Sequence, residues 1–343
     1  MKISVIGGGS WGTALANHLA NKGYQPITVL VKEEKYLKEI NQDHTNNDYL
    51  PDLKLNENLI ATMDYEDISD SDIILLSIPS HAMRSVVKTL KEYLGDNKPT
   101  LVSTTKGIEE GTHLRMSEVI ISELGEEYWN HLTVLSGPTH AEEVSRGLPS
   151  SCVIAAKHKK LAESVQDVFM SPELRVYINP DIVGVEMGGS LKNIIAVAAG
   201  IADGLGYGDN TKAALITRGL TEIGRLGVAM GAQLMTFAGL SGMGDLVVTC
   251  ASMHSRNRRF GIEIGKGKSL DEAAEIVQQV AEGVRTCRAV YNMIQDMDIE
   301  MPITTQCYKL LYEGKDPEEG VSQLMTRGAK HEIEEVARED FEW

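Results

Sequence analysis

The chain has 343 residues, of which 42% are hydrophobic, so it is long enough to bury a core, and its length suggests about two domains. Its 33 basic and 49 acidic residues give a formal net charge of -16. This charge opposes general attraction to nucleic acid or to an anionic membrane surface, so no nucleic-acid partner is expected and a small anionic ligand would need a local basic pocket.

Signals for secretion, membrane insertion and metal binding are absent from the sequence. The N-terminal run MKISVIGGGSWG is too short for a signal peptide, and the longest apolar run, which begins at Ile73, is far shorter than a bilayer span. Four widely spaced cysteines form no CxxC pair and are expected to be reduced, and no zinc-type motif predicts a metal. We therefore expect a cytoplasmic protein without membrane insertion and without a metal.

The first half of the chain alternates apolar runs rich in β-branched residues with amphipathic stretches. The runs are ISVIG, ITVLV, IILLSIP, TLVSTT, LTVLSGP and SCVIAA, and the segment TALANHLANKG lies between the first two. This order is typical of βαβ units. We predict an α/β, Rossmann-type domain over residues 1–180, with a mostly parallel sheet and helices on both faces.

A glycine-rich loop follows the first predicted strand. Gly7, Gly9 and Gly12 satisfy the pattern GxGxxG between the strand ISVI and the helix TALANHLA. In this context the glycines allow a tight turn, close approach of a dinucleotide diphosphate and helix packing, and the helix N-terminus favours the anion. The motif predicts binding of NAD or NADP. Trp11, inside the loop, either lines the cofactor or packs beneath it.

The residues after the second predicted strand bear on the choice of cofactor, because the adenosine ribose is bound about 20 residues past the glycine loop. The chain reads Val31-Lys32-Glu33-Glu34 there. A carboxylate accepts hydrogen bonds from the ribose of NAD and repels the extra phosphate of NADP, so we expect use of NAD at least equal to use of NADP. In the alternative, both glutamates begin a helix and Lys32 alone faces the ribose, which favours NADP.

Two further segments end predicted strands at the edge where doubly wound sheets bind ligands. One segment carries Lys106, and the other is the turn from Ser136 to Ala141. An ordinary surface lysine and a tight turn would also account for them. His140 in this turn, and His254 later in the chain, have no visible partner carboxylate, so structural roles are expected for both.

From about Asn179-Pro180 onward the chain is rich in Ala, Gly, Leu and Met with helical spacing. We predict a helical domain over residues 181–343 that shares a substantial interface with the first and ends in a charged helix, GAKHEIEEVAREDFEW. Lys192 interrupts a nearly apolar helix in this domain. An ammonium group there extends to solvent, pairs with an acid or takes part in chemistry.

A group of polar residues lies within and after the glycine-rich segment GLSGMGD. Its members are Asp245, Thr249, Ser255, Arg256 and Asn257. Hydroxyl, guanidinium and amide donors that lie close together can bind a phosphate. The alternative, a basic surface turn or a nucleic-acid patch, is opposed by the acidic composition and by the lack of interleaved aromatic residues.

Taken together, these segments resemble the bacterial NAD(P)-dependent glycerol-3-phosphate dehydrogenases along essentially the whole chain. The matching segments are GGGSWGTALA, STTKGIE, LSGPTHAEEV, VEMGGSLKNIIAVAAGIADGLGYGDNTKAALITRG, GLSGMGDLVVTCAS, HSRNRRFG, AEGVRT and MPIT. The chain departs from the family after the second strand, where the family often has an aromatic residue, a small residue and one or two basic residues.

The resemblance implies reversible hydride transfer between NAD(P)H and dihydroxyacetone phosphate, which gives sn-glycerol 3-phosphate for phospholipid synthesis. It implies that Lys192 is catalytic. The other substrate-binding residues that it implies are Lys106, Gly137, Thr139, Asp245, Ser255, Arg256 and Asn257. It also implies that the cofactor is bordered by Ser10, Trp11, Lys106, Ala141, Arg256, Val280 and Glu282, in addition to the glycines of the loop and Lys32.

On this reading, Lys192 protonates the substrate carbonyl, Lys106 is a second cation, and Asp245 orients Lys192 through a charge-assisted hydrogen bond. The size of the helical domain makes a homodimer the expected assembly. Two alternatives stay open. One is another two-domain nicotinamide dehydrogenase, of hydroxyacyl or sugar-acid type, and the other is a noncatalytic Rossmann protein that senses the cofactor and needs neither Lys192 nor a phosphate site.

Overall fold

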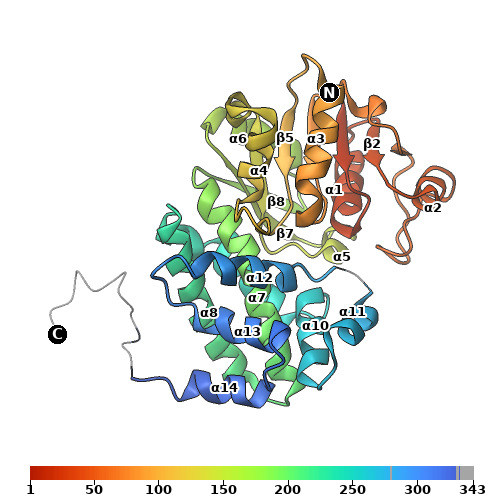
Figure 1. Ribbon diagram of the computed structural model, residues 1–343. Helices are drawn as coiled ribbons and strands as arrows, with labels where there is room; N and C mark the ends of the chain where they lie inside the picture. The colour runs from red at the N-terminus through yellow and green to blue at the C-terminus, as the bar shows by residue number, and fades with distance from the viewer. Residues whose placement is uncertain (279, 330–331, 333–343) are drawn as a thin grey trace.

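The computed structural model describes residues 1–278, 280–329 and 332, and it consists of an α/β part followed by a helical part (Figure 1). The strands are β1 (Ile3–Ile6), β2 (Ile27–Leu30), β3 (Leu59–Thr62), β4 (Ile73–Leu76), β5 (Thr100–Ser103), β6 (Leu132–Ser136), β7 (Ser150–Ala156) and β8 (Leu174–Asn179). The helices of the first part are α1 (Ser10–Asn21), α2 (Glu34–Lys38), α3 (Met83–Leu94), α4 (Met116–Leu124), α5 (Ala141–Val144) and α6 (Lys159–Phe169).

The helical part begins directly after the last strand. Its helices are α7 (Ile182–Gly204), α8 (Asp209–Ala229), α9 (Asp245–Ala251), α10 (Arg256–Gly265), α11 (Leu270–Val277), α12 (Glu282–Ile294), α13 (Pro302–Tyr312) and α14 (Pro317–Met325). The predicted fold class, an α/β domain followed by an all-α domain, is therefore confirmed. The charged helix predicted over residues 328–343 lies, except for Gly328, Ala329 and Glu332, outside the described residues.

The strands form one eight-stranded sheet in the order β3-β2-β1-β4-β5-β6-β7-β8. All neighbouring strands are parallel except β6 and β7, so the prediction of a mostly parallel sheet is correct. The chain passes from β3 at one edge of the sheet back to β4 beside β1. The strand order therefore reverses between β1 and β4, and open α/β sheets bind ligands at the carboxyl ends of such strands.

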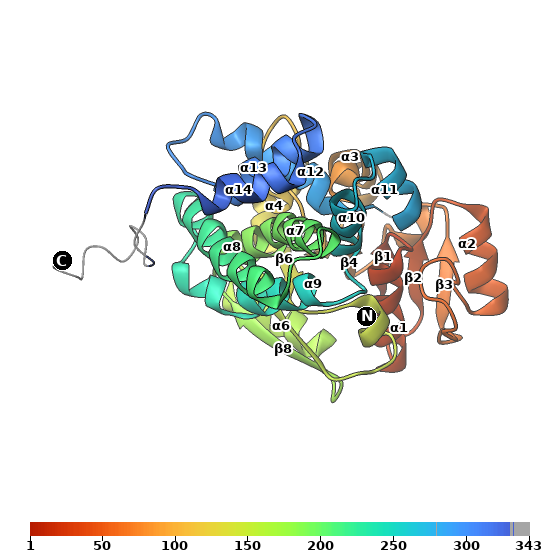
Figure 2. The same ribbon diagram turned by 90° about the horizontal axis from the view of Figure 1, so that it is seen from below.

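Alternation along the strands divides the core of the first part into two layers. Ile3 and Val5 of β1 pack with α1 and α6 on one face of the sheet. Ile6 of β1 and Leu76 of β4 pack with α3 and α4 on the other face. Figure 2 shows these two helices on the opposite side of the sheet from α1 and α6. Because successive side chains of a strand point to opposite faces, these short apolar strands are buried on both sides.

Two strands, β3 and β8, were not among the predicted apolar runs. Both lie at edges of the sheet. Alternate residues of β8, such as Arg175 and Tyr177, are exposed, and Ile60 of β3 is also exposed. An edge strand buries fewer of its side chains than a central strand, so it lacks the continuous apolar run that marks the central strands.

The long helix α7 is the centre of the helical part, and Figure 2 shows it surrounded by α8, α9, α10, α12 and α13. Of the described helices, α7 alone is long and apolar enough to cross a membrane, and 94% of its most apolar window is buried inside the protein. The longest apolar segment is therefore this helix and not the run at Ile73. Glu186, Lys192 and Asn193 interrupt its apolar sequence, so a continuous apolar run does not indicate its full length.

Helices α7 and α10 cross with their backbones in contact. A Cβ atom on Gly200 of α7 would lie 2.1 Å from the Arg258 carbonyl oxygen, and one on Gly261 of α10 would lie 2.1 Å from the Val197 carbonyl oxygen. Gly204 and Gly265 repeat this arrangement one turn further along both helices. The close approach fixes the beginning of α10 relative to the part of α7 that carries Lys192.

Candidate active site

The loop between β1 and α1 has the geometry that the glycine motif predicts. Gly7 has a φ of +114°, and a Cβ atom there would lie 2.3 Å from the carbonyl oxygen of Ser77, in the segment after β4. A Cβ atom on Gly12 would lie 2.0 Å from the Gly7 carbonyl oxygen, so both positions require glycine. A Cβ atom on Gly9 would meet only the Tyr49 ring, at 4.0 Å. Gly9 therefore leaves the outer surface of the loop open to a ligand.

The N-terminus of α1 lies next to this open surface. No side chain caps the helix, so its first amide groups are available to an anion. The hydroxyl of Ser10 donates to the Tyr49 carbonyl oxygen at 3.0 Å. Trp11 packs against the small apolar cluster formed by Ala14, Leu50 and Ala141. The two interpretations of Trp11, that it lines the cofactor or packs beneath it, both stay predictions.

The residues after β2 have the local structure of the alternative in which both glutamates begin a helix. Lys32, Glu33 and Glu34 are all exposed. Glu33 is the N-cap residue of α2, and Glu34 is its first residue and pairs with Lys38 at 2.8 Å. The two acids therefore begin a helix, where they suit the helix dipole, and Lys32 precedes them. The expected cofactor preference itself stays a prediction.

Three charged groups meet where the sheet edge faces the helical part. Lys106, in the segment after β5, donates to Asp245 Oδ2 at 2.6 Å. Lys192, in α7, donates to Oδ1 of the same carboxylate and to Thr249 Oγ1, the latter at 2.7 Å. Asp245 begins α9, and Thr249 lies one turn later on the same face. The predicted contact of Asp245 with Lys192 is therefore present, and Lys106 shares the carboxylate.

Burial controls the electrostatics of this group. Lys192 is 6% exposed and Asp245 is 1% exposed. Burial lowers the pKa of Lys192 to about 8; Asp245 opposes this change and Lys106 adds to it. Burial by itself would raise the pKa of Asp245, but the two ammonium groups outweigh it and hold that pKa below its ordinary value. The carboxylate of Asp245 therefore stays ionised between the two lysines, and Lys192 releases its proton at a lower pH than an ordinary lysine.

Two glycines of α7 let the neighbouring segments approach Lys192. A Cβ atom on Gly188 would lie 2.6 Å from the Ser241 carbonyl oxygen, and one on Gly189 would lie 2.7 Å from the hydroxyl oxygen of Ser136. The turn that leads into α9 and the end of β6 therefore both rest directly on the helix. This close packing brings the beginning of α9, with its carboxylate, to the lysine.

The turn after β6 adjoins the lysine pair. Gly137 has a φ of +144°, and a Cβ atom there would lie 2.9 Å from the Cα atom of Cys152, so the turn requires glycine. The Gly137 carbonyl oxygen accepts hydrogen bonds from Lys106 Nζ at 3.3 Å and from Thr139 Oγ1 at 3.2 Å. The structure thus brings Lys106, Gly137 and Thr139 together, as the resemblance implies.

His140 and His254 lie close together, with ring centroids 5.8 Å apart. Burial, and secondly the positive charge of Lys192, lower the pKa of His140. The positive charge of Lys192 therefore acts on His140, and nothing in the sequence indicates that the two residues lie close together. The structural roles expected for the two histidines stay a prediction.

The N-terminus of α10 carries the predicted phosphate-binding residues. Ser255 caps the helix and accepts a hydrogen bond from the Arg258 amide at 3.2 Å. The amide of Asn257 donates to Asn193 Oδ1 at 2.9 Å, and its oxygen accepts from the Gly283 amide at 2.8 Å. Asn257 therefore connects α10 to α7 and α12, in addition to any contact with a ligand.

Arg256 and Glu282 lie between the two parts of the chain. Burial lowers the pKa of Arg256, while Glu142 and Glu282 oppose this change. Within the described part of the chain, Arg256 has no hydrogen bond or ion pair. Glu282 accepts hydrogen bonds from the amide and the hydroxyl of Ser80, at 3.0 and 2.6 Å, and so ties α12 to the segment after β4. Val280, two residues earlier, is 41% exposed.

Thr249 has a different partner from the one that the sequence suggests. The sequence groups Thr249 with the phosphate-binding residues, whereas its hydroxyl contacts Lys192. The four-residue spacing from Asp245 could have indicated this, because both residues share one face of a helix. Ser80 and Tyr49 were not singled out, and no motif surrounds them. Among the described residues, no cluster of His, Cys, Asp or Glu could hold a metal ion.

Comparisons with known proteins cover both parts of the chain. Residues 2–162 match the family model described as NAD-dependent glycerol-3-phosphate dehydrogenase N-terminus, and residues 181–322 match the corresponding C-terminus model. A protein of Halothermothrix orenii named glycerol-3-phosphate dehydrogenase [NAD(P)+] is 56% identical over 100% of this chain and 99% of its own length. A protein of the same name from Thermoanaerobacter is 53% identical over 97% of this chain and 99% of its own length.

A solved structure is similar over almost its full length. The crystal structure of glycerol-3-phosphate dehydrogenase from Coxiella burnetii has a TM-score of 0.90 and 39% sequence identity, and the match covers 95% of this chain and 99% of that chain. The arrangement of the α/β and helical parts is therefore similar in both proteins.

Proposed function

Since the chain belongs to the NAD-dependent glycerol-3-phosphate dehydrogenase family, we propose that it transfers a hydride between NAD(P)H and dihydroxyacetone phosphate, reversibly, to form sn-glycerol 3-phosphate. The observation that carries this proposal is the carboxylate of Asp245, which holds Lys106 from one part of the chain and Lys192 from the other. A noncatalytic cofactor sensor would not need this arrangement.

The glycine loop and the uncapped N-terminus of α1 fit a dinucleotide, because the surface at Gly9 is open and the first amides of the helix are available to a diphosphate. When bound, the dinucleotide supplies or accepts the hydride at the carbonyl carbon of the substrate. The residues proposed to bind it are Gly7, Gly9, Ser10, Trp11, Gly12, Lys32, Lys106, Ala141, Arg256, Val280 and Glu282.

Lys192 is the proposed general acid. Its ammonium donates a proton to the carbonyl oxygen as the carbonyl carbon becomes that of a secondary alcohol, and the neutral amine then recovers a proton from water. In the reverse direction the neutral amine removes the proton of the hydroxyl. The pKa of about 8 suits both directions near neutral pH, because neither form of the side chain is strongly disfavoured.

Asp245 and Lys106 position Lys192 and set the charge around it. The carboxylate fixes the ammonium through a charge-assisted hydrogen bond, and Lys106 adds positive charge that stabilises negative charge developing on the carbonyl oxygen. Arg256 is the proposed main ligand of the substrate phosphate, because a guanidinium forms paired hydrogen bonds with phosphate oxygens. The other residues proposed to contact the substrate are Gly137, Thr139, Ser255 and Asn257.

The proposed domains are residues 1–180 and 181–343. The end of β8 at Asn179, the beginning of α7 at Ile182 and the match of the C-terminal family model from residue 181 support this boundary.

The product would supply the backbone of phospholipids. A reducing cytoplasm suits the four cysteines, which are buried and unpaired. The proposed assembly is a homodimer, and exposed apolar side chains such as Met235, which is 78% exposed, are candidates for its contact.

A spectrophotometric assay tests the function. The purified protein is expected to oxidise NADH or NADPH when dihydroxyacetone phosphate is added, and sn-glycerol 3-phosphate should be the product. Dihydroxyacetone without phosphate is the matched control, and it should be reduced far less efficiently because it cannot engage Arg256. Equal efficiency with both compounds would exclude the proposed phosphate site. Cofactor binding without any turnover would favour the sensor.

A further inference from the structure

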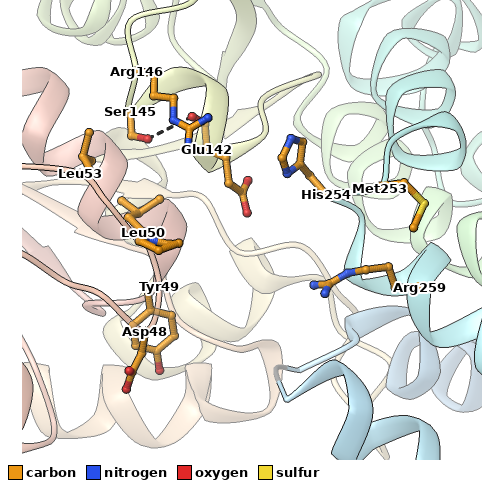
Figure 3. Close-up of a pocket in the computed structure, with 11 residues that line it drawn as sticks. Asp48, Tyr49, Leu50, Leu53, Glu142, Ser145, Arg146, Met253, His254 and Arg259 are labelled. Carbon is orange, nitrogen blue, oxygen red and sulfur yellow. Dashed lines mark hydrogen bonds between the residues drawn. The ribbon is translucent and has the colours of Figure 1, made fainter.

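A cavity of about 310 Å³ lies between the loop 48–53, α5 and the first turns of α10 (Figure 3). Tyr49 lies on one wall, Glu142 and His254 project from neighbouring walls, and Arg259 points its guanidinium across the gap toward Tyr49. The cavity therefore lies between the nucleotide-binding sheet and the helical part, and no role has been assigned to Arg259 so far.

Arg259 differs from its neighbour in α10 in having no partner. Arg258 donates to Asp203 at 2.7 Å and to the Ala251 carbonyl oxygen at 2.9 Å, so its charge is satisfied within the protein. The Nε atom of Arg259 is buried and has no hydrogen-bond partner, and the side chain forms no ion pair with any residue that the structure describes. A buried, unsatisfied donor on a charged group is costly unless a ligand completes it.

A second unpaired guanidinium lies beside the first. Arg256 is one turn earlier on the same helix and interacts electrostatically with Arg259, which lowers the pKa of Arg256. Although the protein has a formal net charge of -16, neither of these adjacent cations forms an ion pair with a residue that the structure describes. An anion bound between them would relieve their repulsion.

The acidic groups near the cavity do not neutralise Arg259. Asp48, on the same wall as Tyr49, pairs with Lys35 at 2.5 Å and accepts a hydrogen bond from the Tyr36 hydroxyl at 3.1 Å. Glu142 is the remaining nearby carboxylate in the cavity, and it lies close enough to Arg256 to oppose the fall in the pKa of that arginine. Glu282, the other carboxylate that acts on Arg256, accepts hydrogen bonds from the amide and hydroxyl of Ser80, and neither glutamate forms an ion pair with Arg259 among the described residues.

The opposite wall of the cavity is built on the glycine loop. The Tyr49 ring lies 4.0 Å from the position that a Cβ atom of Gly9 would take, and the Tyr49 carbonyl oxygen accepts the hydroxyl of Ser10. Tyr49 therefore borders the open surface at Gly9 and also lines the cavity into which Arg259 points. A ligand on that surface would extend toward α10.

From these contacts we propose that Arg259 binds a phosphate group of the dinucleotide from the helical part of the protein, opposite the N-terminus of α1. The inference rests on the proposed function, because it requires a bound dinucleotide. It goes beyond that function by adding a binding residue on α10 and by making the cofactor a link between the two parts of the chain. The phosphate is either part of the diphosphate common to both cofactors or the 2′-phosphate of NADP.

Equilibrium binding without substrate tests this proposal. The dissociation constants of NADH and NADPH are measured by cofactor fluorescence for the parent protein, Arg259→Gln and Arg259→Lys. Arg259→Gln is expected to raise the dissociation constant about tenfold, since a charge-assisted hydrogen bond to phosphate is lost. If the dissociation constants of both cofactors rise, the contact is to the diphosphate. If only that of NADPH rises, the contact is to the 2′-phosphate. Arg259→Lys should lose less affinity because it keeps the charge.

A matched control removes the same charge elsewhere. Arg175→Gln, on the exposed edge strand β8, should leave both dissociation constants unchanged. Raised salt should weaken binding less steeply in Arg259→Gln than in the parent, because one screened interaction is missing. Dissociation constants within twofold of the parent for both cofactors, in a variant with an unchanged thermal transition, would overturn the inference. That result would leave the proposed function intact, whereas a parent that binds cofactor but does not reduce dihydroxyacetone phosphate would overturn the function alone.

Discussion

Lys192 is nearly buried, and its ammonium is held by a carboxylate that it shares with Lys106. We expect Lys192→Ala to lower kcat by about two to four orders of magnitude, the usual contribution of general acid-base catalysis. Cofactor affinity should stay nearly unchanged. Steady-state kinetics and cofactor titration measure both, with Lys160→Ala, an exposed lysine of α6, as the control. Near-parental turnover would remove Lys192 from the mechanism.

The lowered pKa of Lys192 predicts how the rate depends on pH. Reduction requires the ammonium form, so kcat/KM for dihydroxyacetone phosphate should fall as pH rises through about 8. Oxidation of glycerol 3-phosphate requires the neutral amine, so its kcat/KM should rise over the same range and then level off. Profiles measured in both directions check this. Inflections at about 10.4, the ordinary value for lysine, would show that burial does not control the group.

The cofactor preference depends on residues after β2. The prediction is use of NAD at least equal to use of NADP, and the position of Glu33 and Glu34 at the beginning of α2 supports the competing view, in which Lys32 favours NADP. Kinetics with both reduced cofactors decide between them. A tenfold or greater preference for NADPH, about 1.4 kcal/mol, would contradict the prediction. An unchanged preference in Glu33→Ala would exclude that residue as the ribose ligand.

At the scale of elements, the crossing of α7 and α10 fixes the phosphate-binding end of α10 relative to Lys192. Gly261→Ala would place a methyl group 2.1 Å from the Val197 carbonyl oxygen, so the helices would have to separate. We expect destabilisation of about 1–3 kcal/mol, as for other overpacked cores, together with a raised KM for the substrate. Urea unfolding and kinetics measure these effects.

Gly328→Ala is the control for this crossing, because Gly328 is exposed outside any helix and no atom lies within 4 Å of a Cβ atom placed on it. It should change neither quantity appreciably. If Gly261→Ala were as stable and as active as the control, the backbone contact between the two helices could not be what positions the site.

At the scale of the whole molecule, a buried group joins the two parts away from the site. Glu186 of α7 accepts hydrogen bonds from the guanidinium of Arg115 and from the amide and hydroxyl of Ser117, the last two at 2.8 and 2.6 Å. Glu186→Ala should cost about 3–5 kcal/mol, because the buried guanidinium of Arg115 loses its buried partner and keeps only the partly exposed Glu118. Thermal and denaturant unfolding measure the loss. Glu275→Ala, an exposed acid of α11, should be nearly neutral, and an equal effect of both changes would contradict the interpretation.

Much of the architecture follows from local patterns. Continuous apolar runs predict the central strands, and the glycine motif predicts the loop geometry at Gly7 and Gly12, since both signals depend on residues that are neighbours in the chain. Local patterns do not predict the edge strands β3 and β8 or the full length of α7. Both strands lack a continuous apolar run, and polar residues interrupt the apolar sequence of α7.

The sequence by itself determined the order of the central strands, the change from an α/β to a helical part, the dinucleotide loop and, through resemblance to a family, the residues expected at the site. Only the tertiary structure decided that Lys106 and Lys192 share the carboxylate of Asp245, which lies 139 positions from Lys106, and that Arg259 points across a cavity toward Tyr49 with its Nε atom unpartnered. The physical reason is that hydrophobic periodicity and turn chemistry act over a few residues, whereas contacts between distant segments exist only once the packing of the whole chain brings them together.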